Sequence, residues 1–102
     1  MIVIVTAPAR ADTNDAADAY DLRQAGLGDR FLDAVDKTLE RIGFMPRASG
    51  RVNRCPRGRE VRESLVHRFP FRLVYEICSG EAHVLSVTPA RSVRQTWRRR
   101  LP

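Results

Sequence analysis

The sequence has few of the residues on which several common kinds of site depend. It holds two cysteines in 102 residues, Cys55 and Cys78, which form no C-x-x-C pair and have no histidine at metal-ligand spacing. A Gly-rich phosphate loop, a nucleophile elbow and a metal-binding motif are absent as well. We therefore expect no zinc site, no other metal and no cofactor.

Long apolar runs are also missing. The apolar opening, Met1–Val5, is far shorter than the roughly 20 residues that a helix needs to span a bilayer. The N-terminus lacks the basic segment and long apolar stretch of an export signal. We therefore expect the chain to act in the cytoplasm and not in a membrane.

Lysine is nearly absent, since Lys37 is the single lysine and every other basic residue is an arginine. Residues 1–46 carry five basic and eight acidic side chains, whereas residues 47–102 carry 13 arginines and four glutamates. A GC-rich coding sequence would also produce arginine, but it would not concentrate arginine after Pro46. The distribution favours a surface that binds nucleic acid or an acidic protein partner.

The length of the chain allows one domain with a modest core, which we assign to residues 1–102. Residues 1–6 are mostly β-branched and show no polar alternation. This pattern is typical of a strand buried on both faces, central or near-central in a sheet.

Two helices are expected after this strand. Thr6 can cap the first helix with Pro8 in its first turn, and this helix should run to about Ala25. The second helix follows Gly26 and Gly28 and ends at Gly43 and Pro46. Its apolar residues recur at steps of four, four and three: Phe31, Val35, Leu39 and Ile42.

The second half of the sequence predicts a basic loop over residues 46–59 and then three strands, at residues 61–69, 71–78 and 82–88, joined by tight turns. The predicted fold is therefore α+β, in the order β-α-α-β-β-β. The helix hairpin packs on one face of a mainly antiparallel twisted sheet. The other face is left to solvent or a ligand.

Three arginines lie among the apolar residues of these strands. Arg62 and Arg72 have polar neighbours at strand spacing and Arg91 follows the last strand, so a meander could bring the three together. Converging guanidinium groups bind phosphate bidentately and stabilise charge during phosphoryl transfer. The alternative is three separate surface arginines, solvated or paired with Glu63 and Glu76.

His67 and His83 could act as general acid and base, as metal-independent RNA cleavage would require, although a lone histidine on a strand is more often half-buried and hydrogen-bonded. Trp97 lies near Arg94 in a basic tail that suits base stacking beside phosphate contacts. A single tryptophan near a chain end more often anchors that end to the core, so we favour packing for Trp97.

Several local motifs resemble the RelE/ParE superfamily of toxins from bacterial type II toxin-antitoxin systems. They are Gly28-Asp29-Arg30-Phe31 at the start of the second helix, the hairpin Arg68–Tyr75, and the segment Val87–Trp97 with its Arg91. The similarity spans nearly the whole chain. It implies the same fold, a growth-inhibiting toxin, a role in plasmid stabilization and a cognate antitoxin as partner.

The superfamily has two branches with different activities. In the branch that cleaves mRNA on the ribosome, basic residues on the sheet and a C-terminal tyrosine carry the chemistry. Arg72 and Arg91 match two of these arginines, and Arg62 is the nearest substitute for the expected lysines. Trp97 stands where the tyrosine would be, and it has no hydroxyl for proton transfer.

The Phe69-Pro70-Phe71 hairpin and the Gly26–Phe31 helix start are more similar to the ParE branch, whose members poison DNA gyrase without catalysis. Pro89 replaces a histidine frequent in the family, and Val93 stands where a proline is usual, so the chain resembles a divergent member. The resemblance implies a gyrase inhibitor whose target or phosphate contacts are Arg62, Arg72, Arg91, Arg94 and Trp97. One alternative is an mRNA endoribonuclease acting on the ribosome, with Arg62, Arg72, Arg91 and one of the histidines His67 and His83 as catalytic candidates. Another is a module that binds nucleic acid through the basic loop and tail, with strongly salt-dependent affinity and without toxicity.

Overall fold

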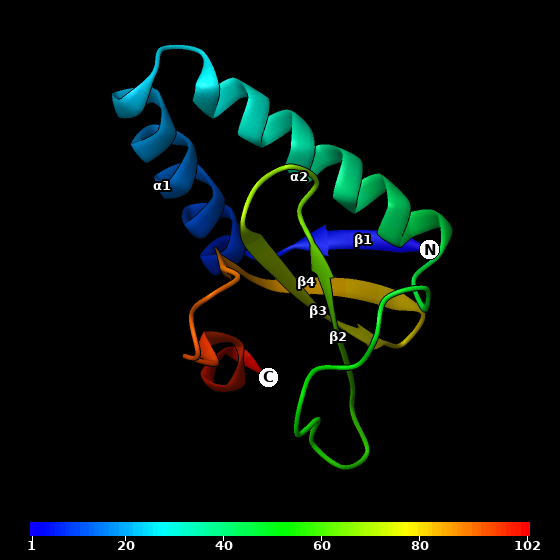
Figure 1. Cartoon of the computed structure of the whole chain (residues 1–102). Coiled ribbons are helices and arrows are strands. Elements are labelled where there is room, and N and C mark those ends of the chain that lie inside the picture. Colours follow the sequence, from blue (N-terminus) through cyan, green and yellow to red (C-terminus); the bar gives the residue numbers. More distant parts are fainter.

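The computed structural model describes residues 1–102 and confirms the predicted order of elements. The strands and helices are β1 (Ile2–Val5), α1 (Ala7–Arg23), α2 (Leu27–Phe44), β2 (Glu60–Leu65), β3 (Phe71–Cys78), β4 (Glu81–Pro89) and a C-terminal 3-10 helix, η1 (Thr96–Arg100). The sheet has the strand order β1-β4-β3-β2, in which only β1 and β4 are parallel. The helix pair covers one side of the sheet, and the loop before β2 and the C-terminal segment lie on the other side (Figure 1).

The predicted cap of the first helix is confirmed. Thr6 is the N-cap of α1, and its Oγ1 accepts a 3.4 Å hydrogen bond from the Ala9 amide. The same hydroxyl donates to the carbonyl of Val84 at 2.7 Å. The start of α1 is therefore fixed to β4, which sets how the helix crosses the sheet.

A close contact between the two helices depends on Gly28. This glycine is buried at the start of α2, and a Cβ there would collide with the Ala17 carbonyl oxygen of α1. The Gly28 amide donates to Oδ1 of Asp21 at 2.7 Å, which ties the two helices together where they meet. The position requires glycine because the backbones approach closely, and not because of an unusual φ.

The larger core lies between the helix pair and the sheet. It joins Phe31, Val35 and Ile42 of α2 to Leu73 and Tyr75 of β3. Four aromatic rings meet at one end of this core, with centroids 4.9 to 6.0 Å apart, and they belong to Tyr20, Phe31, Phe69 and Phe71. This cluster anchors the turn between β2 and β3 to both helices.

The prediction that the first strand is central and buried on both faces is wrong. β1 lies at the edge of the sheet and pairs only with β4. Val3 and Val5 pack against the helix-side core, whereas Ile2 on the other face is 65% exposed. A run of β-branched residues is therefore compatible with an edge strand that is covered on one face only.

The second face of the sheet is not simply left to solvent, as the alternation had suggested. A smaller core covers part of it and consists of Val52, Val61, Val74, Leu85 and Trp97. Val52 comes from the loop before β2 and Trp97 from η1, so two segments without strand or α-helix structure supply the cover. The loop and the C-terminal segment thereby become parts of the folded body.

A β-bulge in β4 connects this cover to α1. The pairing of β3 with β4 shifts register so that Val74 pairs with Ser86 and Tyr75 with Val84, which leaves Leu85 as the extra residue. Next to the bulge, the Val87 amide donates to Oδ2 of Asp12 at 3.0 Å. Nη1 of Arg100 donates to the Leu85 carbonyl at 2.9 Å and to the same Asp12 oxygen at 2.7 Å.

Candidate functional site

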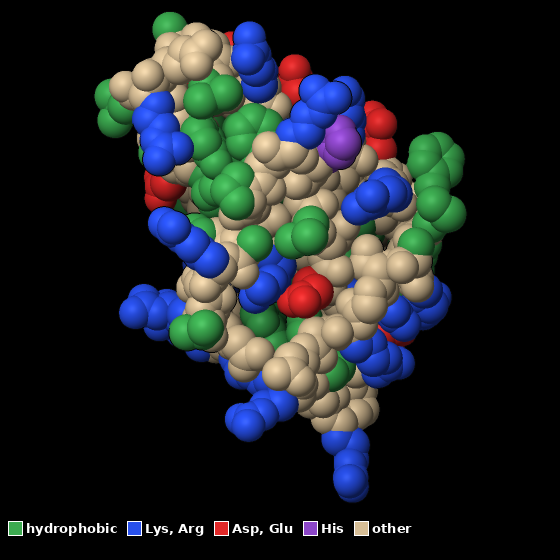
Figure 2. Space-filling view, in the orientation of Figure 1, with side chains coloured by type: hydrophobic (Ala, Val, Ile, Leu, Met, Phe, Trp, Pro, Cys, Tyr) green, Lys and Arg blue, Asp and Glu red, His purple; other side chains and the backbone are tan.

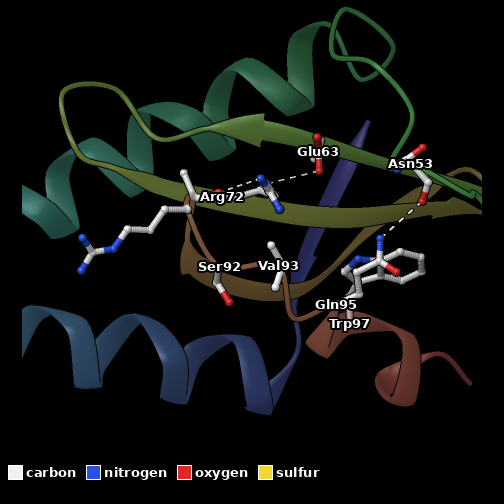
Figure 3. A pocket seen from close by; sticks show the side chains of 9 residues that line it. Asn53, Glu63, Arg72, Ser92, Val93, Gln95 and Trp97 are labelled. Carbon is white, nitrogen blue, oxygen red and sulfur yellow. Dashed lines mark hydrogen bonds and ion pairs between the residues drawn. The ribbon is translucent and has the colours of Figure 1, made fainter.

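An open hollow of about 310 Å³ lies on the second face of the sheet, and three of the predicted site residues line it. We call it the arginine hollow, and its lining residues are Asn53, Glu63, Arg72, Ala90, Arg91, Ser92, Val93, Gln95 and Trp97. Figure 3 shows Glu63 and Arg72 on the strands along one side, and Ser92, Val93, Gln95 and Trp97 on the segment along the other side. The hollow therefore separates the β2–β3 hairpin from the chain that follows β4.

Arg72 is held in place on the wall of the hollow. Its Nη2 donates to the Ala90 carbonyl at 2.7 Å, and its Nε lies 3.4 Å from Oε2 of Glu63 (Figure 3). The side chain of Arg72 is 30% exposed and that of Glu63 is 38% exposed. Nη1 of Arg72 makes no hydrogen bond within the chain, so it can still donate to a ligand.

Arg91 has a different role in the same hollow. It is exposed, and its side chain makes no hydrogen bond or ion pair with the rest of the chain. Two guanidinium groups and one carboxylate leave the hollow with an excess positive charge. Such a surface favours an anionic or hydrogen-bond-accepting group of a partner, to which Arg91 can add a full set of donors.

Arg62 does not join Arg72 and Arg91, which corrects the predicted convergence of all three. Arg62 pairs with Tyr75 and Leu65 pairs with Arg72, without a shift in register between them. Residues 62 and 65 point to opposite faces because side chains alternate along a strand. Arg62 therefore lies on the helix side of the sheet, away from the arginine hollow.

On its own face Arg62 belongs to a structural network. Its Nε donates to Oε2 of Glu60 at 2.8 Å, and its Nη1 donates to the Ser49 carbonyl at 2.6 Å. Arg47 makes two further hydrogen bonds to the Glu60 carboxylate, at 2.8 and 2.9 Å. The hydrogen bonds from Arg47 and then Arg62 hold the pKa of Glu60 below its ordinary value. The network fixes the first residues of the loop to β2.

Neither histidine lies in the arginine hollow. His67 is exposed in the turn between β2 and β3 and lines a separate groove beside α2. His83 lies near the start of β4, with its Nε2 3.3 Å from Oε1 of Glu81. It is five residues from Thr88, the register partner of Arg72, which corresponds to roughly 16 Å along the strand.

Trp97 and Arg94 complete the predicted set. Trp97 is 4% exposed and packs in the smaller core, so the preference for packing is confirmed. Trp97 also lines the hollow. Arg94 is exposed just beyond the hollow, and its side chain has no partner within the chain.

Sequence reasoning missed several residues of the hollow. The sequence indicates Glu63 only as a partner of a surface arginine, and in the structure it is the partner of Arg72. Asn53 and Gln95 had no signal, because they meet only when the loop and the C-terminal segment pack together. The Gln95 side chain donates to the Asn53 carbonyl at 3.5 Å (Figure 3).

The chain matches the model of a known protein family over most of its length. The model of the family described as "ParE toxin of type II toxin-antitoxin system, parDE" matches residues 3–94. The chain belongs to the ParE toxin family. As a member of this family it is the toxin of a type II toxin-antitoxin system, and membership implies a cognate antitoxin as partner.

Solved structures support the fold of this ParE family member. A chain from a structure titled "Chromosomal ParDE TA system from P. aeruginosa" is 22% identical in sequence, with a TM-score of 0.66. The match covers 89% of the present chain and 97% of the other. No curated protein sequence matches the chain.

The chemistry that the ParE family member can perform in its arginine hollow is limited by the residues present. Glu63 is the only acidic side chain that lines the hollow, no histidine lines it, and Glu63 already lies against Arg72. No group of three or more histidine, cysteine or acidic side chains is placed to hold a metal ion, and no helix is long and apolar enough to cross a membrane. The arrangement is suited to recognising a partner.

Proposed function

We propose that this ParE family toxin inhibits DNA gyrase in the cytoplasm by binding it without chemistry, and that a cognate antitoxin neutralises it. The observation that supports this function most is the composition of the arginine hollow. The guanidinium group of Arg72 is held by intramolecular contacts and that of Arg91 is free, while both histidines lie elsewhere on the molecule. A site with hydrogen-bond donors and no paired acid and base favours recognition over RNA cleavage.

In this proposal Arg72 binds the target with a guanidinium group that is already held in place. Its bonds to Ala90 and Glu63 hold the guanidinium plane, so little conformational freedom is lost when a ligand binds to Nη1. Arg91 supplies affinity through charge, because it has no partner to give up on binding. Together they would hold a carboxylate or another anionic group of the target protein.

The antitoxin would bind the adjacent apolar groove. This groove lies between α1 and the start of β3, and it is lined by Ala16, Ala19, Tyr20, Arg23, Pro70, Phe71, Pro89, Ala90 and Arg91. Figure 2 shows apolar side chains gathered on this part of the surface with basic side chains at its margin. An amphipathic segment with acidic residues fits such a surface. Because Ala90 and Arg91 also line the arginine hollow, the bound antitoxin would block Arg91.

The test measures supercoiling by purified gyrase in the presence of the purified toxin. The wild-type protein should inhibit supercoiling, and Arg91→Ala should weaken inhibition at least tenfold while the protein stays folded, because Arg91 has no intramolecular contact to lose. Arg10→Ala is the matched control, since Arg10 is also exposed without a side-chain partner but lies on α1. It removes the same charge and should inhibit like wild type.

Other outcomes would reject the proposal. Gyrase that keeps full activity at micromolar toxin, together with cleavage of transcripts on the ribosome in induced cells, would favour the endoribonuclease alternative. Equal losses for Arg91→Ala and Arg10→Ala would show that the hollow has no special role. Normal growth after induction without an antitoxin would contradict both activities.

A further inference from the structure

The arginines after Pro46 fall into two groups that differ in their contacts. One group is engaged: Arg47 and Arg62 bind Glu60, Arg59 binds Glu76, Arg72 binds Glu63, Arg100 binds Asp12, and Arg51 and Arg98 bind carbonyl oxygens. These contacts occupy three of the four glutamates after Pro46, and the fourth, Glu81, faces His83. The remaining arginines therefore have no free glutamate in this half of the chain, and none of them forms an ion pair with an acidic residue of the first half.

Four of the unpaired arginines lie on the loop before β2 and on the C-terminal segment. We call them the arginine rim, and they are Arg54, Arg57, Arg94 and Arg99. All four are exposed, and none makes a side-chain hydrogen bond or ion pair within the chain. Basic side chains protrude around the lower end of the molecule in Figure 2, where Figure 1 places this loop and the C-terminal segment.

The two segments that carry the rim are joined into one body. Nη2 of Arg98 donates to the carbonyl oxygens of Asn53 and Arg54 at 3.2 and 2.7 Å, and the Arg98 guanidinium lies 4.4 Å from the Trp97 ring centroid. Nη2 of Arg59 donates to the Pro102 carbonyl at 2.7 Å. The rim arginines therefore project from two segments that are fixed to each other.

We propose that the arginine rim binds the phosphate backbone of double-stranded DNA without reading its sequence. Arginine side chains that are charged, exposed and unpaired are the groups that bind backbone phosphates and release their counterions. The rim has no α-helix that could enter the major groove, because the five-residue η1 is a 3-10 helix whose tryptophan is buried. Base readout is therefore not expected.

Two features favour a DNA duplex over other anionic partners. Single-stranded nucleic acids are bound with aromatic side chains that stack on bases, and Trp97, the aromatic side chain of these segments, is 4% exposed. A protein partner would be expected to bury apolar residues at the centre of the interface. No large hydrophobic residue is exposed between residues 50 and 59 or between residues 94 and 102, and the exposed apolar side chains nearest to the rim in the sequence, Met45 and Val93, are single residues outside these ranges.

The inference is separate from the proposed gyrase inhibition, since it concerns a direct equilibrium with DNA and shares only Arg94 with the predicted target contacts. The experiment titrates the purified full chain into fluorescent 20-base-pair DNA duplexes of two unrelated sequences, over a range of salt concentrations. With four phosphate contacts, the logarithm of the affinity should fall with the logarithm of the salt concentration with a slope of about −3 to −4. The protein should bind the two duplexes with equal affinity.

The decisive variants remove two charges from different places. Arg54→Gln with Arg57→Gln should make the salt slope shallower by about 2 and weaken binding roughly 10- to 50-fold near 0.1 M salt. Arg10→Gln with Arg30→Gln changes the net charge equally, using exposed arginines on α1 and α2, and should leave both quantities close to wild type. Thermal unfolding of both variants checks that each is folded.

Three results would overturn the proposal. Equal losses in the two double variants would show that only the overall positive charge matters. Tighter binding to single-stranded DNA of the same length would indicate stacking on bases. Displacement of the duplex by polyglutamate at an equal concentration of charge would indicate a surface for acidic proteins.

Discussion

Replacing Trp97 with alanine tests whether the C-terminal segment is part of the folded body. Trp97 is almost fully buried and contacts residues from the loop and from three strands in the smaller core. Large-to-small changes at buried tryptophans cost about 3–5 kcal/mol, because transfer free energy is lost and a cavity remains. Since this core has only five residues and lies near the surface, part of the cavity can collapse. We expect a loss of about 3 kcal/mol in the free energy of unfolding.

That loss is a large part of the roughly 5–15 kcal/mol that stabilises a typical domain. It should be measured by urea denaturation followed by circular dichroism, because the variant has no tryptophan fluorescence. Amide hydrogen exchange should accelerate in residues 50–59 and 96–102, while the amides of α1 and α2 keep most of their relative protection. Trp97→Phe should retain about half of the lost stability.

The reasoning would be refuted if Trp97→Ala unfolded within about 0.5 kcal/mol of wild type, which is the range of ordinary surface substitutions. It would also be refuted if exchange increased uniformly over the chain, because the smaller core would then not be the unit that is lost.

Two further changes test the packing of the helices and the Glu60 network. Gly28→Ala should lower the free energy of unfolding by about 2–3 kcal/mol in urea denaturation, since the added methyl group would collide with the backbone of Ala17. Gly50→Ala is the control. Its new methyl group would have no atom within 4 Å, so stability should change by less than about 0.5 kcal/mol. Similar values for both glycines would contradict this. Hydrogen bonds from Arg47 and Arg62 lower the pKa of Glu60 in the folded state. The ionised Glu60 therefore stabilises the protein above the pKa that it has in the unfolded chain, and this contribution is lost as the pH falls through the lower folded-state pKa. Glu60→Gln should therefore be less stable than wild type at pH 7 and approach it in acid, and an equal gap at every pH would be inconsistent with the network.

The order of the elements could be predicted from the sequence, whereas the pairing of the strands could not. Helical periodicity and the Thr6 cap located the helices, and the turns at Pro70 and Gly80 separated the strands. Whether Arg62 and Arg72 share a face depends on register, because a shift of one residue moves a side chain to the other face. The length of the turn decides that register, and composition does not determine it.

The site was predictable only in part for a related reason. The strand order brings Arg72 close to Arg91, since Arg72 pairs with Thr88 near the end of β4 and Arg91 follows that strand. Asn53 joins them through a loop that has no periodicity, and its position depends on the burial of Val52 beside Trp97. Tertiary packing of irregular segments leaves no local pattern in the sequence.

The edge position of β1 shows the same limit. Ile2 and Ile4 are apolar although they face away from the helices, and Ile2 is largely exposed. β-branched residues fit an extended backbone whether or not both faces are covered. Local composition therefore identified a strand but not its neighbours.

The contacts of Asp12 have a consequence for the order in which the chain folds. They join Asp12 to Val87 and Arg100, which are 75 and 88 positions away in the sequence. Contacts over such separations close large loops and form late, whereas the α1–α2 hairpin needs only neighbouring residues. We therefore expect a folding chain to gain its helices before its arginine-bearing end takes shape. Partly folded molecules would then have the acidic half of the protein without a formed basic surface.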